Sequence, residues 1–163
     1  MKVDEIDWTA WKPGETATLC FVVRGGEILL IRKKRGLGAG KINGPGGRVD
    51  PGESVAQCAV RECQEEIGIT PGGLFKAGEL YFHFLDGYKL LCTAFRADSY
   101  TGELKETDEA APFWQPVDGI PYGEMWADDA HWLPLLLARR TFKGYFVFDD
   151  DKMLDLRLDE QAL

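Results

Sequence analysis

Three glutamates within five residues are the strongest chemical signal in the sequence. Glu62, Glu65 and Glu66 belong to a segment, residues 54–67, that carries helix-end signals on both sides. Successive residues of a helix are rotated by about 100°, so the three carboxylates share one face. Like charges at these spacings repel one another and cost roughly 0.2–0.5 kcal/mol per pair. A hard divalent cation such as Mg²⁺ or Mn²⁺ would remove that repulsion, because it prefers clustered carboxylate oxygens.

A bare E-x-x-E-E on a helix has a second interpretation, a solvated acidic face with Arg61 as ion-pair partner. The surrounding residues favour a dedicated site. Residues 47–69 read GRVDPGESVAQCAVRECQEEIGI and resemble the box that defines the Nudix hydrolase family. The positions that match its pattern are Gly47, Glu53, Arg61, Glu62, Glu65, Glu66, Gly68 and Ile69. Cys63 stands where an aliphatic residue is usual, and cysteine is itself a small hydrophobe.

The resemblance implies an α/β/α sandwich and hydrolysis of a nucleoside diphosphate linked to another group. It also implies divalent metals, which would let an acidic protein hold an acidic polyphosphate. Arg61 would orient one glutamate through a charge-assisted hydrogen bond, and Glu53 would support the loop before the helix. Either Glu66 or Glu109 would be the general base. By the same resemblance the expected metal ligands are the Gly46 carbonyl, Glu62, Glu65, Glu66 and Glu109.

The likeness extends beyond the box to the MutT-like branch of the family, whose mammalian members act on oxidised purine nucleoside triphosphates such as 8-oxo-dGTP. The segments that carry it are KKRGLGAGKINGPGGRVDPGE, PYGEMWADDAHWLPLLLARRTFKGYF and DKMLDLRL. That branch implies release of a nucleoside monophosphate and pyrophosphate. The implied substrate-binding residues are Thr18, Lys33, Asn43, Pro45, Gly46, Gly47, Arg48, Trp126, Asp128 and Asp129.

Asp128 and Asp129 would read the purine edge, because two adjacent buried carboxyl groups disfavour double ionisation and one can act as a donor. Trp126 would stack on the base. The alternative for the Asp-Asp pair is a helix N-cap, since a helix is expected to follow it. Leu37 and Ala110 depart from the branch, which has larger side chains there, and they predict a roomier pocket.

Other functions remain open at this point. The chain could hydrolyse another nucleotide, such as ADP-ribose, a dinucleoside polyphosphate or an RNA 5′ end. It could also be a Nudix module that binds a nucleotide without turnover, although such modules tend to lose box glutamates and all of them are present here.

The elements that must position these residues follow from hydrophobic patterning and turn signals. Ser54 and Gln57 resemble a capping box, and Gly68 is a plausible helix stop. We expect an α/β (α+β) fold with helices at 54–67 and 130–140 and a glycine-rich loop at 33–47. The expected strands are 16–23, 28–31, 80–84, 89–96, 113–117, 145–148 and 153–158.

Bulk properties narrow the function classes further. The 163 residues suit a single Nudix domain, 1–163, with an N-terminal arm at 1–15. The formal net charge of −8 opposes binding to a nucleic-acid polymer. No segment has the pattern of a signal peptide or membrane span, so we expect a cytoplasmic protein with four reduced, buried cysteines. His83 lies in a predicted strand and is assigned no chemical role, and the sequence gives no oligomeric state.

Overall fold

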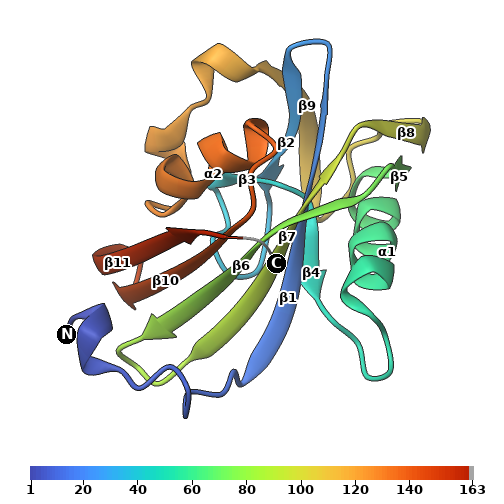
Figure 1. Ribbon diagram of the computed structural model, residues 1–163. Helices are drawn as coiled ribbons and strands as arrows, with labels where there is room; N and C mark the ends of the chain where they lie inside the picture. The colour runs from blue at the N-terminus through green and yellow to red at the C-terminus, as the bar shows by residue number, and fades with distance from the viewer. Residues whose placement is uncertain (162–163) are drawn as a thin grey trace.

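The fold is built on one large mixed β-sheet. A computed structural model describes residues 1–161 (Figure 1). Nine strands form the sheet, seven of them in the order β11-β10-β6-β7-β1-β2-β3, while β4 pairs with β1 and β9 with β2. Strands β1 and β7 are parallel, as are β6 and β10, and the other neighbours are antiparallel. The strands of this sheet are β1 (Glu15–Arg24), β2 (Glu27–Lys33), β3 (Ile42–Asn43), β4 (Gly46–Arg48), β6 (Phe75–Phe84), β7 (Lys89–Ala97), β9 (Ala110–Pro116), β10 (Phe142–Asp149) and β11 (Lys152–Glu160).

Helix α1 (Val55–Ile67) covers one face of this sheet. The predicted capping box is present, because the Ser54 side chain accepts from the Gln57 amide and the Gln57 side chain accepts from the Ser54 amide. Gly68 ends the helix with φ 78°, a conformation that costs glycine little. The apolar residues beneath α1 form a buried cluster whose members include Cys20, Val22, Leu29, Ala59, Cys63, Ile67 and Phe95.

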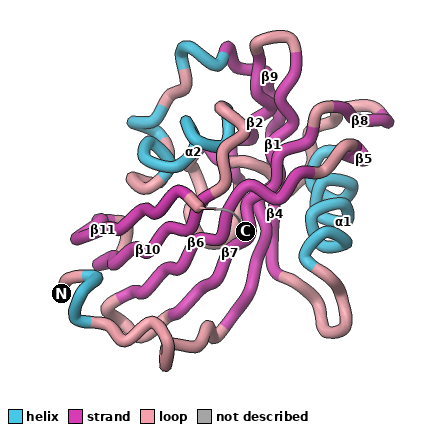
Figure 2. Tube along the Cα trace, in the orientation of Figure 1, coloured by secondary structure: helices cyan, strands magenta, loops and turns pink. Residues whose placement is uncertain are grey.

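Helix α2 (Asp129–Leu137) packs on the opposite face, so that the sheet lies between the two helices (Figure 2). The core under α2 includes Phe21, Leu80, Trp132, Leu136, Phe142 and Phe146. Residues of β1 alternate between the two clusters, as the period of two in a strand requires. The α/β/α sandwich expected from the sequence is therefore confirmed. Within the described part of the chain, no helix is both long and apolar enough to span a bilayer.

The N-terminal arm docks beside the sheet at β6, β10 and β11 (Figure 1). It contains the short 3-10 helix η1 (Val3–Glu5), and the Val3 side chain is buried. The Val3 amide donates to the Asp155 carboxylate at 2.8 Å. Trp8 contacts the Tyr145 ring at 5.0 Å between centroids. The Trp11 indole donates to Nδ1 of His83 at 3.1 Å, which gives that histidine a structural role.

Most differences from the predicted elements concern short strands and element ends. The expected loop at 33–47 contains β3 and the start of β4, two strands of two and three residues. A separate two-stranded sheet, β5 (Ile69–Gly72) with β8 (Ser99–Gly102), was not predicted. Helix α2 stops at Leu137, short of residue 140. All seven expected strands extend further than expected at one or both ends, although β9 ends one residue early. All four cysteines are free and buried, as expected.

Candidate active site

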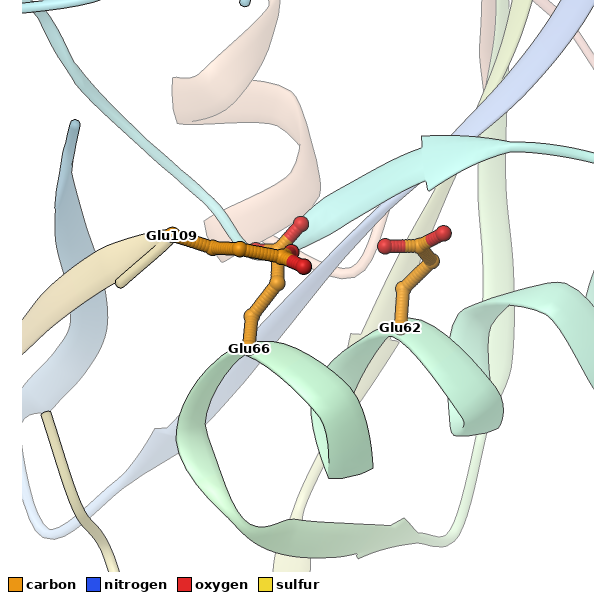
Figure 3. Close-up of side chains that lie close together, drawn as sticks. All are labelled: Glu62, Glu66 and Glu109. Atoms are coloured by element: carbon orange, nitrogen blue, oxygen red, sulfur yellow. The ribbon is translucent and has the colours of Figure 1, made fainter. Parts of the chain in front are cut away.

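An acidic cluster forms where α1 meets the loop before β9. Glu62 and Glu66 project from α1, and Glu109 reaches them from the residue preceding β9 (Figure 3). One carboxylate oxygen from each of these glutamates lies within 4.8 Å of the others. Thr107 ties the two elements together, because its hydroxyl donates to the Glu66 carbonyl at 2.7 Å and accepts from the Glu109 amide at 3.2 Å. Helix and loop therefore hold three acidic groups at the distance at which one cation can contact them all.

The glycines of β4 let the backbone approach this cluster closely. Strand β4 pairs with β1 at Leu19 and Gly46, and the Gly46 amide points to Oε2 of Glu66 at 3.4 Å. A Cβ at Gly47 would lie 2.4 Å from the Glu62 carboxyl carbon, and one at Gly46 would collide with the Thr18 carbonyl. A side chain at position 46 would collide with backbone, and one at position 47 would displace the Glu62 carboxylate. Glycine at both positions therefore preserves the geometry of the acidic cluster.

The electrostatics of the cluster are those of crowded carboxylates. Burial raises the pKa of Glu66 to about 9, with a further contribution from the neighbouring charges of Glu62 and Glu109. The Gly46 amide opposes part of this rise in the pKa of Glu66. A carboxyl group in this condition favours either a proton or a bound cation. The donor set of clustered, partly buried carboxylates therefore fits a hard divalent metal.

Arg61 is the basic centre of the site. It forms a two-point ion pair with Glu53, with Nε to Oε2 at 2.7 Å and Nη2 to Oε1 at 2.9 Å. Its Nη1 donates to Glu62 at 2.8 Å and to Glu65 at 3.2 Å. Its Nη2 also donates to the Arg48 carbonyl at 2.9 Å, which joins α1 to β4. The hydrogen bonds from Arg61 lower the pKa of Glu53 to about 2.

Glu65 lies outside the acidic cluster. Its side chain is 51% exposed and is paired with Arg61. The structure therefore brings together Glu62, Glu66 and Glu109, while the metal role expected for Glu65 stays a prediction.

A cavity of about 380 Å³ opens beside the cluster, and Glu66 lines it. Its wall includes residues from the sheet, from the glycine-rich loop and from the segment before α2. The sequence-predicted residues that line it are Thr18, Lys33, Leu37, Asn43, Gly46, Gly47, Arg48, Trp126, Asp128 and Asp129. Pro45 and Ala110 are not part of the lining; the Pro45 carbonyl accepts from the Cys20 amide, and Ala110 is buried beneath α1.

Asp128 and Asp129 are almost fully buried at this cavity. Asp128 occupies the N-cap position of α2 but makes no capping hydrogen bond; its Oδ2 accepts from the Trp132 indole at 2.7 Å. Among residues 1–161, Oδ1 of Asp128 and Oδ2 of Asp129 have no hydrogen-bond partner. Burial raises the pKa of Asp128 to about 6, and burial beside Asp128 raises that of Asp129. The helix-cap interpretation therefore does not explain this pair.

Several wall residues were missed by sequence reasoning. The aromatic side of the cavity includes Phe82 and Phe84 of β6 and Tyr88 of the following turn. The alternation at residues 80–84 could have placed both phenylalanines on one face of a strand. Nothing in the sequence indicates that this face lines a cavity, since that depends on the packing of α2 and β10.

Comparisons with known proteins agree with this geometry. A model of the NUDIX domain matches residues 13–136. The chain is 48% identical over 145 residues to a zebrafish (Danio rerio) protein named oxidized purine nucleoside triphosphate hydrolase, covering 88% of this chain and 93% of that protein. The mouse (Mus musculus) protein of the same name is 41% identical over the same shares. The crystal structure of a MutT protein from Bacillus halodurans superposes with a TM-score of 0.81 at 30% identity, covering 89% and 97% of the two chains.

Proposed function

Because this chain belongs to the NUDIX hydrolase family, we propose that it hydrolyses oxidised purine nucleoside triphosphates, such as 8-oxo-dGTP, to the nucleoside monophosphate and pyrophosphate. The support comes from relatives of that name and from one structural observation. A buried pair of aspartates with unpaired oxygens lines the same cavity as Glu66 of the acidic cluster. The proposed base-recognition site and the proposed phosphate-cleaving site thus adjoin the same cavity.

The acidic cluster fits the divalent cation that Nudix hydrolases generally need. We propose Mg²⁺, with Mn²⁺ as a substitute, held by Glu62, Glu66, Glu109 and the Gly46 carbonyl, with Glu65 as a further expected ligand. When bound, such a cation neutralises the polyphosphate and lowers the pKa of water.

The protein's own groups then have distinct tasks. Arg61 offsets the charge of Glu53 and Glu62 and fixes their positions. Glu66 or Glu109 accepts the proton of the attacking water, because both carboxyl groups face the cluster. Gly46 and Gly47 let β4 approach β1 and α1 closely, because a side chain there would collide with the Thr18 carbonyl or the Glu62 carboxylate.

The cavity residues suit an oxidised purine. With its raised pKa, Asp129 keeps its proton and donates, while Asp128 accepts. A donor and an acceptor side by side match the purine edge, and exchange of one proton would serve another tautomer. We propose that Trp126 stacks on the base, that Asn43 and Thr18 hydrogen-bond the nucleoside, and that Lys33 and Arg48 lie toward the phosphates.

We propose that the protein acts on a cytoplasmic nucleotide pool. Four free thiols are compatible with a reducing compartment. A net charge of −8 supports a small phosphorylated substrate over a nucleic-acid polymer.

A panel of substrates tests the proposal. Purified protein with Mg²⁺ should convert 8-oxo-dGTP or 2-oxo-dATP to the monophosphate and pyrophosphate, both of which are resolved by ³¹P NMR. Equal or faster turnover of ADP-ribose, of a dinucleoside polyphosphate or of a capped RNA 5′ end would reject the substrate class while leaving the family intact. Binding of 8-oxo-dGTP without turnover would instead indicate a non-catalytic nucleotide-binding module.

A further inference from the structure

Three residues outside the acidic cluster form a connected polar group at the cavity wall. The Tyr88 hydroxyl donates to Oε2 of Glu15 at 2.8 Å. The same oxygen forms an ion pair with Nε of Arg48 at 2.7 Å. Tyr88 and Arg48 both line the cavity, whereas Glu15 is not part of the lining. One carboxylate therefore holds an aromatic ring and a guanidinium at the same wall.

Strand register explains why these residues meet, although they are far apart in sequence. Glu15, the first residue of β1, is paired with Leu90 of the parallel strand β7. The Gly14 amide donates to the Lys89 carbonyl at 2.9 Å, which fixes the start of β1 next to Tyr88. On the other side of β1, Ala17 is paired with Arg48 of β4. The sheet thus aligns Glu15 and Arg48, and Tyr88 lies in the turn directly before β7.

The Tyr88 hydroxyl is engaged by Glu15, and its ring packs in the aromatic side of the cavity. The ring packs on Phe84 with centroids 5.5 Å apart, and Phe84 in turn contacts Trp126 at 6.3 Å. Burial and the bond to Glu15 raise the pKa of Tyr88 to about 12, so the hydroxyl remains a donor at neutral pH. Tyr88 and Trp126 therefore flank the same phenylalanine and extend one aromatic wall.

Arg48 connects this wall to the acidic cluster. Arg48 directly follows Gly47, and the Arg48 carbonyl accepts a hydrogen bond from Nη2 of Arg61. The same Arg61 nitrogen also pairs with Glu53. Its side chain is 71% exposed, and among residues 1–161 Glu15 is the carboxylate with which it pairs. That contact uses Nε, and the guanidinium also carries two terminal nitrogens, the fork with which arginine binds phosphate oxygens.

We propose that Glu15, Tyr88 and Arg48 form a nucleotide-positioning triad, in which Arg48 binds a phosphate oxygen of the nucleotide whose nucleoside contacts the Tyr88 ring. Glu15 and Tyr88 are positioning residues, because Glu15 acts on the substrate only through Arg48 and Tyr88. This inference rests on the proposed function, since it assigns further contacts to the same substrate.

Binding of two matched probes tests the triad without chemistry. Calorimetry with 8-oxo-dGMP and with 8-oxo-deoxyguanosine, both without metal, separates the phosphate contact from the nucleoside contact. Wild-type protein should bind 8-oxo-dGMP more tightly than 8-oxo-deoxyguanosine, because only the monophosphate can contact Arg48. Arg48→Gln and Glu15→Gln should each weaken monophosphate binding by about tenfold, because a hydrogen bond to a charged group is lost or misplaced. Affinity for the nucleoside should stay within about twofold in Arg48→Gln. In Glu15→Gln, nucleoside affinity should fall less than monophosphate affinity, because Tyr88 also loses its hydrogen bond.

Steady-state kinetics supply a second readout. Tyr88→Phe keeps the ring and removes the bond to Glu15, so KM for 8-oxo-dGTP should rise about three- to tenfold while kcat changes less than about twofold. The double variant Tyr88→Phe/Glu15→Gln should resemble the single variants, because both break one network. Glu79→Gln is the matched control: its carboxylate pairs with Lys76 and Lys143 outside the cavity, and KM should not change.

The outcomes separate this inference from the function on which it rests. If wild-type protein binds both probes and Glu15→Gln weakens both equally, or weakens neither, the triad is refuted and the proposed function stands. If wild-type protein binds neither probe and does not turn over 8-oxo-dGTP, the proposed function fails and the triad fails with it. Thermal denaturation of each variant shows whether the fold is retained, and a KM rise in Tyr88→Phe at unchanged midpoint supports the positioning role.

Discussion

Among single residues, Glu66 is the most buried member of the acidic cluster, and this burial raises its pKa. Its pKa is raised to about 9, so in metal-free protein at neutral pH it carries a proton. Glutamine imitates that neutral form in size and polarity. Glu66→Gln should therefore reduce turnover by about 10²–10⁴-fold while leaving the metal-free fold as stable as before.

Steady-state rates and urea unfolding of Glu66→Gln check both halves of this prediction. Glu103→Gln is a suitable control, because Glu103 is exposed and lies outside the cluster. A turnover rate of Glu66→Gln equal to that of wild type would show that Glu66 has no catalytic role.

The Asp128–Asp129 pair predicts a pH dependence of stability. Burial raises the pKa of Asp128 from 3.8 to about 6 and also raises that of Asp129. A raised folded-state pKa gives a contribution that is complete below the unfolded-state pKa and is lost as pH rises through the folded-state value. The free energy of unfolding of metal-free protein should thus fall between roughly pH 4 and 7. The Asp128 shift alone corresponds to on the order of 2–3 kcal/mol.

Asp128→Asn removes this titration and retains an oxygen for the Trp132 indole. Denaturant unfolding at several pH values should show a flatter profile in this variant than in wild type. A wild-type stability that rises steadily over the same range would contradict the raised pKa values.

At the scale of elements, the close approach of β4 to α1 places Glu62. A methyl group at Gly47 would lie 2.4 Å from the Glu62 carboxyl carbon, so Gly47→Ala should push that side chain out of the cluster. We expect turnover to fall about 10²-fold, because a displacement near 1 Å is costly in an active site. Divalent-cation titration should show weaker binding. Gly123→Ala, where the added methyl meets nothing within 4 Å, should behave as wild type.

Elements that are set by neighbouring residues were predicted from the sequence, whereas short strands that depend on pairing with distant strands were not. Helix α1 was predicted at both ends, because Ser54, Gln57 and Gly68 act within one turn. Strands β3 and β4 were not, since two or three residues carry no periodicity and form only by pairing with β2 and β1. Helix α2 ended early despite its apolar pattern: Arg139 has φ 58°, outside the helical region.

The candidate site divides in the same way. Glu62 and Glu66 share a helix face because of local geometry, so their spacing alone placed them together. Glu65 is adjacent in sequence, yet its half-exposed side chain pairs with Arg61 outside the cluster, and only the three-dimensional structure shows this. Tyr88 and Glu15 meet through the register of β1 and β7, a long-range pairing that a single sequence does not reveal.

For the whole molecule, the N-terminal arm extends the layer on one side of the sheet beyond α1. Trp8 contacts Trp11, Tyr81 and Tyr145, and its indole donates to the Val3 carbonyl. Trp8→Ala should lower the free energy of unfolding by about 1–3 kcal/mol, since a large aromatic contact is lost. Because the arm does not line the cavity, kcat/KM should stay within about twofold. Loss of turnover at unchanged stability would show that the arm takes part in catalysis.

The molecule as a whole is an acidic domain, of net charge −8, whose cavity joins a buried carboxyl pair to an acidic cluster. The ratio of kcat/KM for 8-oxo-dGTP to that for dGTP, measured with Mg²⁺, tests this arrangement most directly. We predict a ratio of at least about tenfold, because one unpaired polar group in a buried pocket costs about 1–3 kcal/mol. A ratio of one or below would contradict selection of an oxidised purine.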